Sequence, residues 1–169
     1  MREIQYNFLH WGPWLCHYKL LPEELEAFNK LEEGENFQKG LAGHLKDEYE
    51  LDKNRVFTII HPYLVSYAQG LYDHRRFKLK PGFELKNAWI NRQKKNEFNP
   101  PHTHDEDLSF VLYTKIPEGL EKECREAVHN SPGPGSITFD FNIPGGSFNN
   151  LFLTTHAHFP SVGDMFIFP

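Results

Sequence analysis

The feature that most constrains the fold is a series of short β-prone segments that begins after Pro81-Gly82. These segments are rich in β-branched and aromatic residues and are separated by Pro, Gly and Asn, a pattern typical of strands bounded by turns. They are FELKNAWINRQ, DLSFVLYTKI, GSITFDFNI, NNLFLTTHAHF and GDMFIFP. Residues 83–169 are therefore predicted to form a β core.

The preceding part of the chain has a helical character. Residues 21–24 read Leu-Pro-Glu-Glu, which combines proline in a first helical turn with acids at the positive end of the helix dipole. Apolar residues recur every three or four positions over 37–51 and again over 55–77, where Pro62 predicts a kink or a later start. We expect a mainly helical region over about 20–80, packed on one sheet, and hence an α+β fold.

Composition limits the classes of function. The chain has 169 residues, enough for one domain, and a net charge of −5, which does not favour binding to a phosphate backbone. The group Arg92, Lys94 and Lys95 is the local exception to that balance. No apolar run suits a membrane span, and the first residues lack the apolar core of a signal peptide, so we expect a cytosolic protein, in a bacterium or a phage host. Cys16 and Cys124 are expected to be reduced thiols.

Two histidines precede one of the predicted strands in the stretch NPPHTHDEDLSFVLYTKIP. On a strand, His102 and His104 would point to the same side, and imidazole nitrogens suit Fe, Zn, Mn, Ni or Cu. The acids at 105–107 would supply a neighbouring oxygen ligand. A solvated polar turn is the alternative, and the spacing alone leaves both open.

A second His-x-His pair, His156 and His158, precedes Phe159-Pro160 near the end of a predicted strand. We favour exposed strand histidines here over a metal site.

The segment NAWINRQKKNEFNPPHTHDEDLSFVLYTKIP and the closing PSVGDMFIFP resemble the 2-oxoglutarate/Fe(II) oxygenases of marine phages and bacteria. The resemblance extends over most of the chain and is strongest over 87–117. The residues that carry it are Trp89, Asn91, Asn99, Pro100, His102, His104, Leu108, Ser109, Val111, Tyr113, Pro160, Gly163, Asp164, Phe168 and Pro169.

This resemblance implies a double-stranded β-helix (jelly-roll) core buttressed by the helices. It also implies an Fe(II)- and 2-oxoglutarate-dependent dioxygenase that uses O₂, a hydroxylase whose primary substrate the sequence does not identify. His102 and His104 are the expected iron ligands. Glu106, as an H-x-E pair with His104, and Asp107 are the less favoured ones.

The co-substrate 2-oxoglutarate is a small molecule, and three polar residues on predicted strands are candidates to bind it. Asn91 and Ser109 would contact it from strand faces. Tyr113 would donate to one of its carboxylates, because a buried phenol needs a partner. A tyrosine with its hydroxyl at the surface is an equally open interpretation.

The sequence departs from the oxygenase pattern at one position, because a histidine stands where the H-x-D/E motif has its acid. The distal histidine and the basic residue that grips 2-oxoglutarate would lie beyond Pro169. We therefore expect a core that lacks its last strands and a chain that is catalytically incomplete. The alternative function is a cupin-like jelly roll that binds a metal or ligand without oxygenase activity, such as a phage accessory or structural protein.

Overall fold

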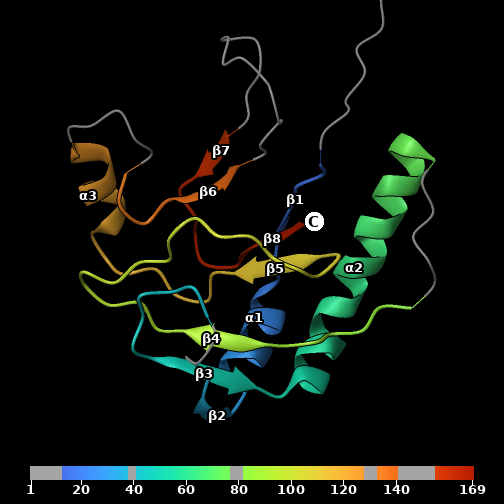
Figure 1. Cartoon of the computed structure of the whole chain (residues 1–169), viewed down its shortest axis with the longest axis horizontal. Coiled ribbons are helices and arrows are strands. Elements are labelled where there is room, and N and C mark those ends of the chain that lie inside the picture. The colour runs from blue at the N-terminus through green and yellow to red at the C-terminus, as the bar shows by residue number, and fades with distance from the viewer. Residues whose placement is uncertain (1–12, 38–40, 77–81, 128–132, 141–154) are drawn as a thin grey trace, which may run out of the picture.

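A computed structural model describes residues 13–37, 41–76, 82–127, 133–140 and 155–169. These residues form three helices and three small antiparallel sheets, so the predicted α+β class is confirmed. The elements, shown in Figure 1, are β1 (Cys16–Lys19), α1 (Pro22–Asn29), β2 (Glu33–Asn36), β3 (Glu48–Leu51), α2 (Lys53–Arg75), β4 (Trp89–Asn91), β5 (Ser109–Leu112), α3 (Leu120–Glu126), β6 (Ile137–Asp140), β7 (Thr155–His158) and β8 (Asp164–Phe168).

The main sheet has the order β1-β8-β5, with β8 in the middle. Both neighbours run antiparallel to it, and the register places His17 of β1 and Val111 of β5 on either side of Phe166. Because side chains alternate along a strand, Asp164, Phe166 and Phe168 share one face. Met165 and Ile167 point to the other.

The helix α2 covers the Met165 face of the main sheet (Figure 1). Its N-terminus is capped by the Asp52 carboxylate, which accepts hydrogen bonds from the N–H groups of Asn54 and Arg55. The buried residues of α2 recur at helical spacing and pack with Leu20, Phe28, Met165 and Ile167; they are Val56, Ile60, Leu64 and Tyr67. Met165 and Ile167 are 0% exposed, so this layer is the core of the molecule.

The opposite face of the main sheet is covered by the β6–β7 hairpin. The Phe139 ring of β6 lies with its centroid 5.3 Å from that of Phe166 and 5.0 Å from that of Phe168. Phe166 is only 1% exposed as a result. The central strand β8 is thus enclosed on both sides, by a helix and by a second small sheet.

The sheet β2-β3-β4 corrects one sequence prediction. The segment 37–51 was expected to be helical, but its last part is strand β3, which pairs with both β2 and β4. Apolar residues at a spacing of four fit a helix, yet backbone pairing with the distant strand β4 prevails. Of the kink or later start predicted from Pro62, the later start is wrong, because α2 begins at Lys53 and continues through that proline.

The described strands do not by themselves make a jelly roll, since they form three separate sheets. The strand suggested by GDMFIFP exists as β8, and it is the central strand of its sheet, with β1 and β5 at the edges.

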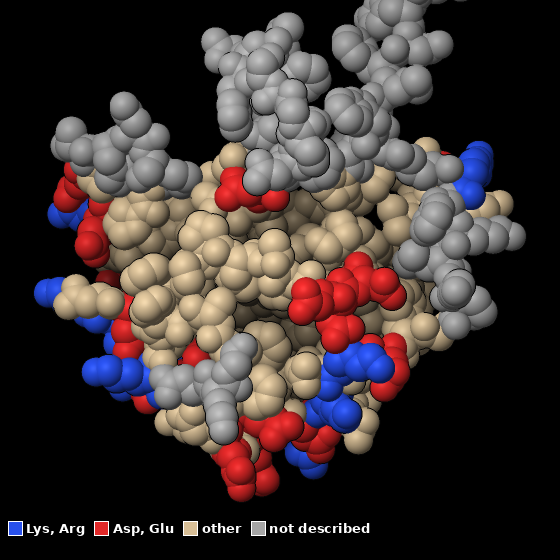
Figure 2. All heavy atoms as spheres, in the orientation of Figure 1, with Lys and Arg blue, Asp and Glu red and all other residues tan. Residues whose placement is uncertain are grey.

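The face drawn in Figure 2 has a largely uncharged centre, with Lys and Arg side chains scattered among Asp and Glu around it. None of the described helices is both long enough and apolar enough to cross a membrane.

Candidate functional site: a histidine–aspartate cluster

Two histidines and one aspartate from three different strands meet on the hairpin side of the main sheet. His17 comes from β1, His158 from β7 and Asp164 from β8, and their candidate ligand atoms all lie within 4.8 Å of one another. The Nε2 atom of His17 is 3.2 Å from Asp164 Oδ1, and Nε2 of His158 is 3.3 Å from Asp164 Oδ2. In the part of the chain that the structure describes, this is the one group of three or more His, Cys, Asp or Glu side chains that could share a metal ion.

Strand register and aromatic packing bring these side chains together. His17 is the cross-strand partner of Phe166, so it shares the face of Phe166 and Asp164. Its ring stacks on Phe166 with centroids 4.6 Å apart, and the His158 ring meets the same phenyl group edge-on at 5.1 Å. Phe166 therefore forms the apolar floor on which both imidazoles rest.

Asp164 is held in place by the turn that precedes β8. Its carboxylate accepts hydrogen bonds from the Ser161 N–H at 2.6 Å and the Ser161 hydroxyl at 3.0 Å. Gly163, with φ 89°, gives the turn its left-handed position. Lys19 of β1, the cross-strand partner of Asp164, donates to Oδ1 at 3.0 Å.

These contacts govern the charge on Asp164, which is 3% exposed. Burial alone would raise the pKa of this carboxyl, but the hydrogen bonds from the Ser161 backbone, Lys19 and His17 outweigh it. The pKa of Asp164 is held well below its usual range, so the group is a carboxylate at any physiological pH.

The arrangement suits two chemical uses. Two imidazoles with one carboxylate are the donor set of non-haem Fe(II) centres, and their ligand atoms lie within 4.8 Å of one another, close enough to gather around one ion. Alternatively, the imidazoles donate hydrogen bonds to the carboxylate and no metal is needed. Lys19 bears on the choice, because its ammonium already neutralises part of the carboxylate's charge.

His102 and His104 lie in the loop before β5, and both are exposed. Their rings are close, with centroids 4.8 Å apart, and Nδ1 of His102 is 2.7 Å from the Pro100 carbonyl oxygen. Partial burial, and then the neighbouring His102, lower the pKa of His104. Across the described residues no third ligand joins this pair: Glu106 and Asp107 are exposed and form no cluster with it. Its metal role stays a prediction.

The predicted co-substrate residues divide between the two larger sheets. Ser109 is paired with Phe168, and Tyr113 follows β5 opposite Asp164, so both lie on the face of the histidine–aspartate cluster. Burial, with a contribution from the Asp164 charge, raises the pKa of Tyr113 to about 12. Asn91 is on β4 of the other sheet and is exposed.

The prediction of exposed histidines in the second His-x-His pair is correct for His156 and wrong for His158, which is partly buried against Asp164. His17 and Asp164 were not predicted as ligands at all. Because side chains alternate along a strand, the sequence GDMFIFP is enough to place Phe166 and Phe168 on the face of Asp164. No pattern in the sequence indicates that β1 pairs with β8.

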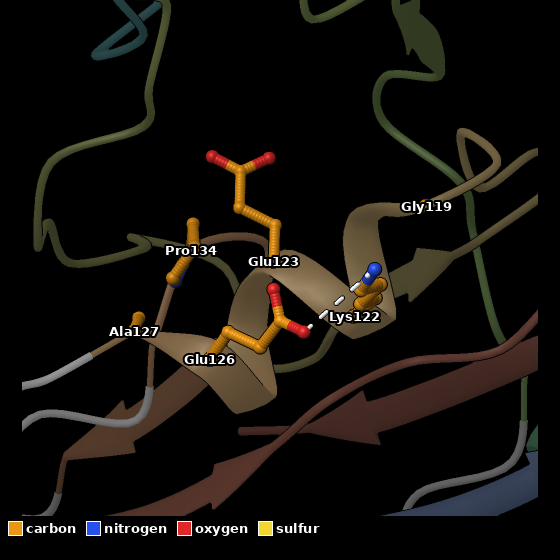
Figure 3. A pocket seen from close by; sticks show the side chains of 6 residues that line it. All are labelled: Gly119, Lys122, Glu123, Glu126, Ala127 and Pro134. Carbon is orange, nitrogen blue, oxygen red and sulfur yellow. Dashed lines mark ion pairs between the residues drawn. The ribbon is translucent and has the colours of Figure 1, made fainter.

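A separate hollow of about 480 Å³ lies beside α3, lined by Gly119, Lys122, Glu123, Glu126, Ala127 and Pro134 (Figure 3). Lys122 and Glu126 pair with each other along the helix at 3.8 Å. The residues that line this hollow include no buried polar group, so the hollow is a weaker candidate for a functional site than the cluster.

No protein-family model, no curated protein and no solved structure matches this chain.

Proposed function

We propose that the chain is an Fe(II)- and 2-oxoglutarate-dependent oxygenase whose iron is held by His17, His158 and Asp164. The observation that carries the proposal is the meeting of two imidazoles and a buried carboxylate, each from a different strand. Separate strands fix such ligands in space better than one flexible loop does. The resemblance of the segments around 87–117 and 160–169 to the oxygenase family supports the same class of chemistry.

The chain's own residues would prepare the site in three ways. Ser161 orients the Asp164 carboxylate, and Phe166 orients both imidazole rings. Phe139 shields this floor from water. Bound iron would supply the activation of O₂ that side chains cannot provide.

The co-substrate would lie on the same face. The Tyr113 hydroxyl remains protonated at neutral pH and is a donor for a carboxylate of 2-oxoglutarate. Ser109, two residues before Val111 on that face, is a second donor. We further propose that the main sheet and the facing β6–β7 hairpin belong to the two halves of a jelly roll, since the hairpin packs on the main sheet through Phe139.

One observation favours a second function, a jelly roll that binds a ligand without oxygenase chemistry. The Asp164 carboxylate already receives hydrogen bonds from Lys19 and Ser161, so the cluster is electrostatically satisfied without an ion. In that case Lys19 is the counter-ion of Asp164 and not a competitor of the metal.

The substitution Lys19→Gln separates the two functions. If the cluster is an iron site, removing the ammonium should strengthen Fe(II) or Co(II) binding at least about threefold, because it removes a repelling charge beside the ligand. If Lys19 serves only as a counter-ion, no metal will bind to either form and the variant will be less stable. Titration calorimetry and the visible bands of Co(II) provide the measurements.

Histidine variants test where the iron lies. His17→Ala and His158→Ala should each abolish Co(II) binding and Fe(II)-dependent release of succinate from 2-oxoglutarate. His156→Ala is the matched control, because His156 is an exposed residue on the same strand as His158, and it should leave both unchanged. If His102→Ala and His104→Ala abolish binding while the His17 and His158 variants retain it, the centre lies in the loop before β5 instead.

A further inference from the structure

Glu48 is a buried carboxylate that lies outside the histidine–aspartate cluster. It begins strand β3 and is 1% exposed, and its Oε2 atom has no hydrogen-bond partner among the described residues. Asp164, the other buried charged residue among them, receives several hydrogen bonds. An orphaned carboxylate oxygen costs free energy unless something compensates it.

The side-chain oxygen of Asn99 lies close to this carboxylate, and no Lys or Arg side chain among the described residues forms an ion pair with it. The side-chain oxygen of Asn99 occupies the space that a β-carbon on Gly43 would take, and Glu48 Oε1 lies 3.2 Å from that same point. Burial raises the pKa of Glu48, and the charge of Glu97 raises it further. The nearby Lys94 ammonium pairs with Asp47 instead.

The missing β-carbon of Gly43 is what allows Asn99 to approach. Two segments meet here, because His44 and Phe98 form an isolated antiparallel bridge and their rings stack at 4.9 Å. Strand β3, which begins with Glu48, pairs with β4, and the loop that follows β4 carries Glu97 and Asn99 (Figure 1).

We propose that Glu48, Glu97 and Asn99 form a second cation site that takes a hard divalent ion of the Ca²⁺ type. Carboxylate and amide oxygens are the ligands such ions prefer, whereas the histidine–aspartate cluster offers mainly nitrogen. The ion supplies the partner that Glu48 Oε2 lacks and offsets the repulsion between Glu48 and Glu97.

Such an ion would also fix the loop that carries the two exposed histidines. Asn99 stands three residues before His102, and His102 is itself tied back to Pro100. Cation binding at Asn99 would therefore order the segment 97–104. This proposal does not depend on the iron site, because its ligands and its preferred ion are different.

The test uses Ca²⁺, which binds weakly to imidazole, with the full chain. Ca²⁺ should raise the Tm of the wild-type protein and slow hydrogen exchange over 97–104, and Glu48→Gln should weaken Ca²⁺ binding at least about tenfold. Glu50→Gln is the matched control, since Glu50 is exposed on the same strand and should bind Ca²⁺ as the wild type does.

Two milder variants keep the test decisive if Glu48→Gln does not fold. Glu97→Gln and Gly43→Ala leave Glu48 in place, but the first removes a ligand and the second displaces Asn99, so both should weaken Ca²⁺ binding. His17→Ala should not affect it. If Ca²⁺ stabilises neither the wild type nor any variant, or stabilises Glu48→Gln equally, the proposal is overturned.

Discussion

At the scale of single residues, two acids are buried in the described part of the chain, in opposite surroundings. Asp164 receives donors from a turn, a lysine and two histidines, and its pKa falls in spite of burial. Glu48 is buried beside another acid, and its pKa rises. Burial by itself does not decide the charge of a carboxyl group; the donors around it do.

The first prediction concerns Asp164→Asn. Removing one partner of a buried charged group should lower the free energy of unfolding at pH 7 by about 3 kcal/mol. Because the folded-state pKa is depressed, the stabilisation from Asp164 is complete above its unfolded pKa, near 4, and is lost as the pH falls below that value. Urea unfolding at pH 7, 4 and 2.5 should show the variant and wild type converging in acid. A constant difference at all three pH values would contradict the assignment.

The control for this series is Glu84→Gln. Glu84 pairs with Lys86 at the surface, where solvent screens the charges, so its replacement should leave the unfolding curve almost unchanged.

At the scale of elements, helix α2 could be predicted from the sequence and strand β3 could not. The apolar periodicity over 55–77 predicted a helix, and the buried residues Ile60, Leu64 and Tyr67 lie at that spacing, because a long amphipathic helix depends mainly on local spacing. Strand β3 was predicted to be helical. Its pairing partner β4 lies about forty residues away, and no local sequence pattern indicates this pairing. The iron-site candidate was missed for the same reason: His17 and Asp164 meet only after β1 pairs with β8.

The second prediction compares two glycines at this scale. A β-carbon on Gly70 in α2 would meet nothing within 4 Å, so Gly70→Ala should raise the free energy of unfolding by about 0.5–1 kcal/mol. A β-carbon on Gly43 would collide with Asn99, so Gly43→Ala should lower it. Chemical denaturation of both variants checks the pair. A loss of stability in Gly70→Ala would contradict the open space beside Gly70.

At the scale of the whole molecule, β8 joins the layers. Its Met165 and Ile167 side chains pack against α2, and Phe166 packs against the β6–β7 hairpin. The overall layout of helices on strands was predictable from the change in character after residue 82. The central position of β8 was not, because a continuous apolar run indicates burial on both faces but does not indicate which strands pair with it.

The third prediction follows from this position. Ile167→Ala would leave a cavity between the sheet and α2 and should cost about 3 kcal/mol. Ile137→Ala on β6, a partly exposed residue, is the comparison and should cost less. Thermal or urea unfolding measures both. Equal losses would mean that β8 is not the centre of the core.

The pairing of β1 with β8 has a consequence for how the protein is made. Synthesis proceeds from the N-terminus, so β1, β5 and α2 leave the ribosome well before the strand that joins them. Until residues 164–168 emerge, the apolar side of α2 has no sheet to cover, and the nascent chain carries exposed Ile60 and Leu64. Contacts this distant in sequence also slow folding. We therefore expect the nascent protein to rely on chaperones that shield apolar helices, and to gain protease resistance only once β8 is available.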